Sequence, residues 1–159
     1  MCDLIKYFEG FRTNAYQDSA GIWTIGYGHT KGVKKGDVIT PEQGHSFLKE
    51  DLIDAENRVE EALPDAQLNN NERKALVSLA YNLRSFEKLV IHLKKDKELF
   101  KRKMLLYCRD VEMNYLKGLK IRRIAERLLF EGKDWLSVAK ELDGKTLEAV
   151  KQKEKELFA

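Results

Sequence analysis

The feature that most constrains the fold is a stretch with four glycines, EGFRTNAYQDSAGIWTIGYGHT at residues 9–30, in a chain otherwise patterned for helices. Residues 18–21, DSAG, are a turn signal because Gly21 can adopt positive φ without steric cost. After this turn, the side chains of residues 22–27 alternate in direction, which is the period of a strand. Together with a short strand at residues 15–17, this pattern predicts a β-hairpin or small meander.

Helical signals surround this stretch on both sides. Apolar residues recur at helical spacing over Asp3–Glu9, and Gly10 stands where a C-terminal cap is expected. Thr40 and Gln43 form a capping-box sequence that starts a helix reaching Pro64, about 33 Å long. Later helices are predicted to begin after Asn69, to extend from Phe86 to Phe130 with a break at NYLKGL, to run from Asp134 through Leu142, and to run from about Thr146 onward.

These elements predict one two-lobed α+β domain that spans residues 1–159. A small lobe at about residues 10–40 holds a short antiparallel sheet, with Val38 and Ile39 as its last short strand. A connecting helix at about residues 41–64 leads to a larger all-helical lobe at about 65–159, which the helix at residues 1–9 joins. The connecting helix is the expected hinge, and a ligand would lie between the lobes.

Charge is distributed unevenly along the chain. Residues 1–80 carry nine Lys and Arg against 13 Asp and Glu, a net charge of −4, whereas residues 81–159 carry 20 against 13, a net charge of +7. A basic second half suits nucleic acid, a lipid surface or an acidic polymer, although a solvated helical surface rich in lysine gives the same count. The sequence has no zinc-finger spacing and no RNA-recognition motif, so we expect no specific nucleic-acid partner.

Several classes of protein are excluded by composition. No apolar run approaches the roughly 18 residues that span a bilayer, so we expect no transmembrane segment. The sequence MCDLIKYFEG has no basic region followed by an apolar stretch, so we expect no secretory leader and synthesis in the cytoplasm. Cys2 and Cys108 are predicted to be separate reduced thiols. They have no metal-ligand spacing with the histidines, and we expect neither a metal nor a cofactor.

Two carboxyl groups and a hydroxyl group near the N-terminus suggest chemistry. Glu9 ends a short helix, where the helix dipole and the rings of Phe8 and Phe11 favour a neutral acid that can donate a proton. Asp18 lies in the predicted turn and is expected to stay ionised, and Thr24 lies on the return strand. An acid, an anionic base and a hydroxyl that orients water are the parts of a glycoside hydrolase. The same three residues could also be a surface acid, a turn-former and an ordinary strand residue.

The motif resembles that of the bacteriophage-type lysozymes (endolysins) of glycoside hydrolase family 24. That motif is Glu-Gly-x-Arg, then Tyr-x-Asp, then Thr-Ile-Gly-x-Gly-His, and every position is filled from Glu9 to His29. The resemblance implies a lysozyme-like fold and a peptidoglycan muramidase that cuts the β-1,4 bond between N-acetylmuramic acid and N-acetylglucosamine. It implies Glu9 as the general acid, Asp18 as the carboxylate that activates water, and Thr24 as the residue that helps to hold this water.

The resemblance also implies residues that surround the reacting groups. Thr30, Tyr81 and Asn82 match substrate contacts, although Tyr81 could equally pack in the core. Three further residues are expected to support the site. His29 is expected to be a structural histidine that hydrogen-bonds within the lobe, and Arg12 and Tyr16 are expected to support the cleft. One of three basic residues in the late helix is expected to pair with Glu9: Lys120, Arg122 or Arg123. The resemblance is poor from Leu83 to Lys117 and has no clear counterpart after about Asp134.

The resemblance implies a biological setting and leaves alternatives. We expect a monomer that is made in the host bacterial cytoplasm, acts on peptidoglycan in the cell wall after release, and is attracted to anionic envelope polymers by its basic helices. A non-catalytic module that binds peptidoglycan or a protein on the same fold is the main alternative. A lytic transglycosylase, which needs one acid and forms an anhydro product, is disfavoured by the pairing of Asp18 with Thr24.

Overall fold

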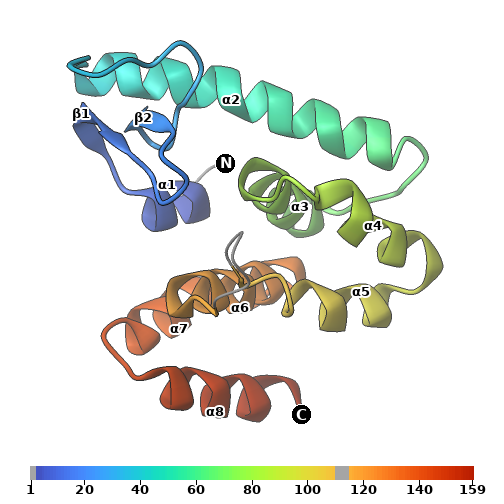
Figure 1. The fold of residues 1–159 in the computed structure, drawn as a ribbon. Coiled ribbons are helices and arrows are strands. Elements are labelled where there is room, and N and C mark those ends of the chain that lie inside the picture. Colours follow the sequence, from blue (N-terminus) through green and yellow to red (C-terminus); the bar gives the residue numbers. More distant parts are fainter. Residues whose placement is uncertain (1–2, 110–114) are drawn as a thin grey trace.

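A computed structural model describes residues 3–109 and 115–159 of the chain (Figure 1). The elements in chain order are α1 (Asp3–Glu9), β1 (Arg12–Gln17), β2 (Trp23–Gly26), α2 (Pro41–Ala62), α3 (Asn70–Asn82), α4 (Phe86–Lys95), α5 (Lys97–Met104), α6 (Lys117–Phe130), α7 (Trp135–Leu142) and α8 (Leu147–Phe158). The fold is therefore mostly helical with a small antiparallel sheet near the N-terminus, as the sequence predicted.

The sheet consists of β1 and β2, which pair in antiparallel fashion with Tyr16 opposite Thr24. A β-bulge or other irregularity lies between Arg12 and Tyr16, and β1 begins three residues earlier than predicted. The expected last strand forms only an isolated bridge between Asn14 and Val38, although backbone hydrogen bonds continue on both sides of it. The hairpin is confirmed, and the third segment is shorter than a strand.

The capping box predicted at Thr40 is confirmed, and the helix predicted to begin after Asn69 starts with a second one. Thr40 accepts a hydrogen bond from the backbone of Gln43, whose side chain in turn accepts from the backbone of Thr40, and α2 begins at Pro41. Asn69 and Glu72 make the same reciprocal pair at the start of α3. Each box satisfies backbone N–H groups that a helix leaves without partners in its first turn, which is why the sequence marks these boundaries well.

The region between Phe86 and Lys117 differs most from the prediction. A boundary at Asp96, where its side chain accepts from the backbone N–H of Glu98, separates α4 from α5. Helix α5 ends at Met104, and the described residues 105–109 that follow it are not helical, so the helix ends before the predicted break. The first residue of the NYLKGL sequence, Asn114, lies outside the described residues.

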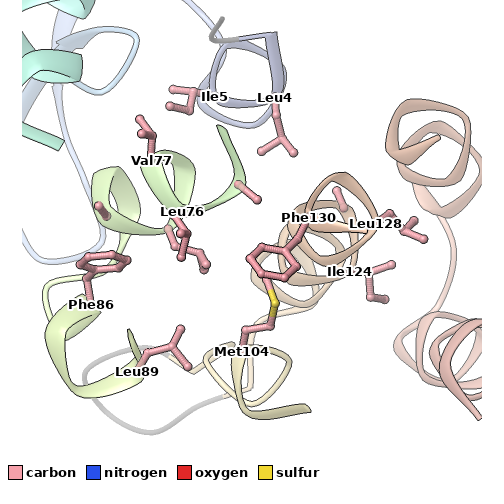
Figure 2. Packing of buried hydrophobic residues seen from close by; sticks show 14 of the residues in the cluster. Leu4, Ile5, Leu76, Val77, Phe86, Leu89, Met104, Ile124, Leu128 and Phe130 are labelled. Carbon is pink, nitrogen blue, oxygen red and sulfur yellow. The ribbon is translucent and has the colours of Figure 1, made fainter. Parts of the chain in front are cut away.

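The helices pack in layers around a shared core. Figure 1 shows α3 between α2 and α6, with α7 and α8 beyond α6. Figure 2 shows Phe130 of α6 beside Met104 of α5, with Leu76 of α3 and Leu89 of α4 in the same cluster. All four are essentially buried, with at most 3% of each residue exposed, and the ring of Phe100 lies 5.3 Å from that of Phe130. This core fixes α6 relative to α3, and both helices carry residues of the candidate site.

The last two helices cover α6 on the side away from α3. Helices α7 and α8 begin directly after Asp134 and Thr146, in agreement with the prediction, and each of these residues caps its helix by accepting a hydrogen bond from a backbone N–H in the first turn. Lys120 of α6 pairs with Glu154 of α8 and donates to the backbone carbonyl of Leu105. Within the described part of the chain, no helix is both long enough and apolar enough to cross a membrane. The division into two lobes hinged at α2 stays a prediction.

Candidate active site

The carboxylate of Glu9 lies at the end of α1 and contacts a buried cation. Its Oε1 is 2.6 Å from Nη1 of Arg122, and the two side chains are 20% and 4% exposed. Of the three basic candidates, Arg122 is therefore the partner of Glu9. Lys120 pairs with Glu154 instead, and Arg123 pairs with Glu126. The surroundings of Glu9 are more polar than the sequence suggested, because its carboxylate contacts the Arg122 guanidinium, which itself lies 5.9 Å from the centre of the Phe8 ring.

Gly28 allows Glu9 to reach the sheet. Its φ is +89°, and a Cβ atom at this position would lie only 2.9 Å from Oε2 of Glu9. Both observations require glycine, because a side chain would strain the backbone and displace the carboxylate. The hydroxyl of Tyr81 donates a 2.6 Å hydrogen bond to the carbonyl of Tyr27, the residue before Gly28. The end of α1, the loop after β2 and the end of α3 therefore meet at the Glu9 carboxylate.

Asp18 shapes the turn between the strands and is half-buried. Its Oδ1 accepts hydrogen bonds from the backbone N–H groups of Ala20 and Ile22, at 2.8 and 2.9 Å. Oδ1 is thus committed to the turn, and Oδ2 makes no hydrogen bond within the described residues. Asp18 can therefore form the turn through Oδ1 and still serve as the predicted base through Oδ2.

Thr24 lies near the start of β2, and only 4% of the residue is exposed. Its hydroxyl donates to the carbonyl of Ile22 at 2.9 Å, so the remaining capacity of the oxygen is as an acceptor. Asp18 and Ile22 are joined by backbone as well as side-chain hydrogen bonds, and Ile22 therefore links the two predicted residues. This shared attachment fixes Thr24 relative to Asp18 through the hairpin.

A network of buried charges lies behind Arg122. Glu126 is fully buried and accepts from Ser78 Oγ at 2.6 Å, from Arg122 Nε at 3.2 Å and from Arg123 Nη1 at 2.5 Å. Burial alone would lower the pKa of Arg122, but the charges of Glu126 and Glu9 outweigh it and raise this pKa. Burial lowers the pKa of Arg123 to about 10, which Glu126 offsets only in part, so both guanidinium groups stay charged at neutral pH.

The predicted substrate contacts occupy different settings. Thr30, Tyr81 and Gly28 line one depression of about 220 Å³, whose other wall is formed by α2. Asn82 is not part of this lining, and its Oδ1 accepts a hydrogen bond from Arg123. The sequence did not indicate the α2 wall, which consists of Asp51, Asp54, Ala55 and Arg58. Tyr81 packs against the core and also lines the depression, so its core role is observed and its substrate contact stays a prediction.

The supporting residues are placed as follows. The ring of His29 stacks on that of Phe47, with centroids 4.3 Å apart, and its Nδ1 lies 2.9 Å from a carboxylate oxygen of Asp51. These contacts suit a structural histidine, but its side-chain partner comes from α2 and not from within the small lobe. Arg12 packs over the ring of Tyr16 at 4.3 Å and steadies β1. A larger depression of about 590 Å³, between the start of α3 and the end of α6, contains none of the predicted site residues.

Comparison with known proteins places the chain in a family. The profile of the Phage lysozyme family matches residues 6–126. An endolysin of Acyrthosiphon pisum secondary endosymbiont phage 1 is 44% identical over 80 residues, which cover 50% of this chain and 54% of that protein. The chain thus matches about half the length of this curated relative.

Solved structures give a more extensive match. The muramidase domain of SpmX from Asticaccaulis excentricus superposes with a TM-score of 0.72 at 29% identity, covering 80% of this chain and 92% of that chain. An endolysin from Escherichia coli O157:H7 phage FAHEc1 superposes with a TM-score of 0.69 at 34% identity, covering 80% and 88%. Because the family profile spans both the motif that begins at Glu9 and most of α6, the chain belongs to the Phage lysozyme family.

Proposed function

We propose that the protein is a muramidase that hydrolyses the β-1,4 bond between N-acetylmuramic acid and N-acetylglucosamine in peptidoglycan. The observation that carries this proposal is the Glu9 carboxylate held between Arg122 and Gly28, at the start of a motif in which every family position is filled. Relatives named endolysins and a structural neighbour named a muramidase domain support the same activity.

Glu9 would act as the general acid. Protonated Glu9 donates to the glycosidic oxygen as the bond to the leaving sugar breaks, which leaves a carboxylate. The ion pair with Arg122 is the arrangement expected after this donation, since a guanidinium stabilises the new negative charge. The depression lined by Thr30 and Tyr81 begins beside Gly28, and would hold sugar residues next to the acid.

Asp18 and Thr24 would activate and orient the attacking water. A water that attacks the anomeric carbon directs a lone pair at it, so both of its O–H groups need acceptors. Oδ2 of Asp18 can accept one, and Oγ1 of Thr24 can accept the other because its own proton is donated to Ile22. Transfer of the water proton that faces Asp18 to its carboxylate would complete the hydrolysis.

Product analysis tests the reaction class and the bond position together. Purified peptidoglycan is digested, and the released muropeptides are analysed by mass spectrometry. Reducing N-acetylmuramic acid ends support the proposal, whereas anhydro ends would indicate a lytic transglycosylase and reducing N-acetylglucosamine ends would indicate cleavage of the other bond.

The Glu9→Gln variant separates the enzyme from a binding module. We expect its activity to fall at least about a thousandfold, because the amide cannot donate the proton, while it still binds peptidoglycan. Glu61→Gln, an exposed position at the end of α2, is the matched control and should keep wild-type activity. Equal activity of Glu9→Gln and wild type would rule out Glu9 as the acid, and a wild type that binds without cleaving would favour the module.

The setting of the proposed enzyme follows from the same relatives and from charge. We propose that a monomer acts in the cell wall after release from the bacterial cytoplasm, in keeping with the relatives' name, endolysin. Basic residues of α5 and α8 meet at a depression of about 410 Å³, where Arg102 and Lys155 are exposed. This surface would attract anionic polymers of the cell envelope.

A further inference from the structure

Glu126 is a charged residue that the proposed chemistry does not use, although it lies one helical turn after Arg122. It is fully buried, and its carboxylate accepts hydrogen bonds from three side chains, those of Ser78, Arg122 and Arg123. A buried carboxylate is costly unless it is paired and hydrogen-bonded. Apolar residues could fill this space at lower cost, so the position of Glu126 calls for a reason other than packing.

The hydrogen bonds of Arg122 suggest this reason. Nε of its guanidinium donates to Glu126 at 3.2 Å, and Nη2 lies 3.5 Å from the hydroxyl of Ser78. These two contacts hold one side of a planar group and leave Nη1 directed at Glu9, 2.6 Å away. A guanidinium held at several nitrogens has one orientation, whereas a long side chain held at one end has many.

We propose that Glu126, assisted by Ser78, is a positioning residue for the proposed general acid. It holds Arg122 against Glu9 and offsets the charge of the two guanidinium groups, so that Glu9 can regain a proton before each turnover. This inference rests on the proposed function, because it assigns Glu126 a role in the same site.

The charges around Glu9 determine the direction of the effect expected when the charge of Glu126 is removed. Arg122, and at greater distance Arg123, present positive charge to Glu9 from α6, while the phenols of Tyr16 and Tyr81 face it from β1 and α3. Glu126 is faced by the same two arginines and by the Ser78 hydroxyl, and Arg123 also interacts with Cys108. Removing the charge of Glu126 leaves two cations against one carboxylate. The ionised form of Glu9 then gains stability over the acid form that must donate.

Two variants test the positioning role by activity. In Glu126→Gln we expect kcat to fall about tenfold with KM within about twofold of wild type, and the alkaline limb of the pH profile of kcat/KM to move about one unit lower. Ser78→Ala keeps every charge and removes one hydrogen-bond donor to Glu126. We therefore expect kcat to fall about threefold while the alkaline limb of the pH profile keeps its wild-type position. Circular dichroism and thermal unfolding check that each variant is folded.

Glu131→Gln is the matched control. Glu131 follows the same helix and also accepts from several cations, but its partners are Lys101, Arg127 and Lys133. We expect this variant to lose stability while its pH profile keeps the wild-type position. A shift of the limb in Glu131→Gln as large as that in Glu126→Gln would overturn the proposal, since any lost helix charge would then suffice.

A measurement that needs no catalysis separates this inference from the proposed function. Carboxyl carbon NMR follows the titration of Glu9 in wild type and in Glu126→Gln, and we expect the midpoint to be about one pH unit lower in the variant. An unchanged midpoint in folded Glu126→Gln overturns the inference even if the enzyme is active. A shifted midpoint in a protein that does not cleave peptidoglycan supports the charge balance and rejects the function. If Glu126→Gln does not fold, wild-type kcat in Ser78→Ala overturns the positioning role.

Discussion

At the scale of single residues, the site depends on the absence of a side chain at Gly28. Its missing side chain gives Oε2 of Glu9 a place beside the loop after β2, and its positive φ turns the backbone there. The sequence marks this position only as part of a motif. The requirement for glycine arises from the contact between the end of α1 and this loop, and no local signal encodes a contact between residues 9 and 28.

We predict that Gly28→Ala loses both stability and activity. Positive φ in alanine should cost about 1 kcal/mol of unfolding free energy, and the new methyl group should displace the Glu9 carboxylate, lowering kcat/KM about a hundredfold or more. Gly144→Ala is the control, because Gly144 has a φ of +73° and no atom within 4 Å of its added Cβ. Denaturant unfolding and peptidoglycan hydrolysis should show similar stability losses in the two variants, with activity lost in Gly28→Ala alone.

At the scale of elements, the sequence predicted helix boundaries best where hydrogen bonds between neighbouring residues determine them. The capping boxes at Thr40 and Asn69 determine the first turns of α2 and α3 by local hydrogen bonds, so spacing alone locates them. The boundary at Asp96 was missed because apolar periodicity continues through it, and Asp96 resembles a surface residue of one long helix. The partner of Glu9 could not be chosen from three basic residues, because the rotation of α6 depends on packing against α3 and α8.

Charge on α5 and α8 gives a prediction at this scale. The double variant Arg102→Gln, Lys155→Gln should attack whole cells about threefold more slowly than wild type, because it loses attraction to anionic envelope polymers. Its activity on soluble peptidoglycan fragments should not change, and added salt should slow wild type on cells in the same way. The matched control, Lys35→Gln with Lys49→Gln, removes the same charge from exposed positions elsewhere. Equal slowing by both double variants would mean that net charge, and not this surface, governs the attraction.

At the scale of the whole molecule, ion pairs join elements that are distant in sequence. Glu131 receives hydrogen bonds from Lys133, Arg127 and Lys101, and so joins the end of α6 to α5. Burial alone would raise the pKa of Glu131, but these three hydrogen bonds outweigh it and lower this pKa below its usual value. Asp51 behaves oppositely, since burial raises its pKa more than the hydrogen bond from His29 lowers it.

These directions predict how stability depends on pH. A carboxyl group whose pKa is lowered by folding adds stability at pH values above its unfolded pKa, and this stability is lost as the pH falls through the folded pKa. Glu131→Gln should therefore unfold more easily than wild type by about 1 kcal/mol at pH 7, and the difference should disappear below about pH 4. Urea unfolding of both proteins from pH 3 to pH 7 measures it. A difference that persists unchanged at pH 3 would assign the loss to packing.

The contact between Glu9 and Arg122 joins residues that are 113 positions apart in the chain. A ribosome that has released only the sheet and the first helices has already made the acid, the base and the threonine, but not the guanidinium that the acid contacts. Completion of the site must therefore await synthesis and docking of α6. The connectivity of the fold by itself delays assembly of the site until translation is well past its midpoint.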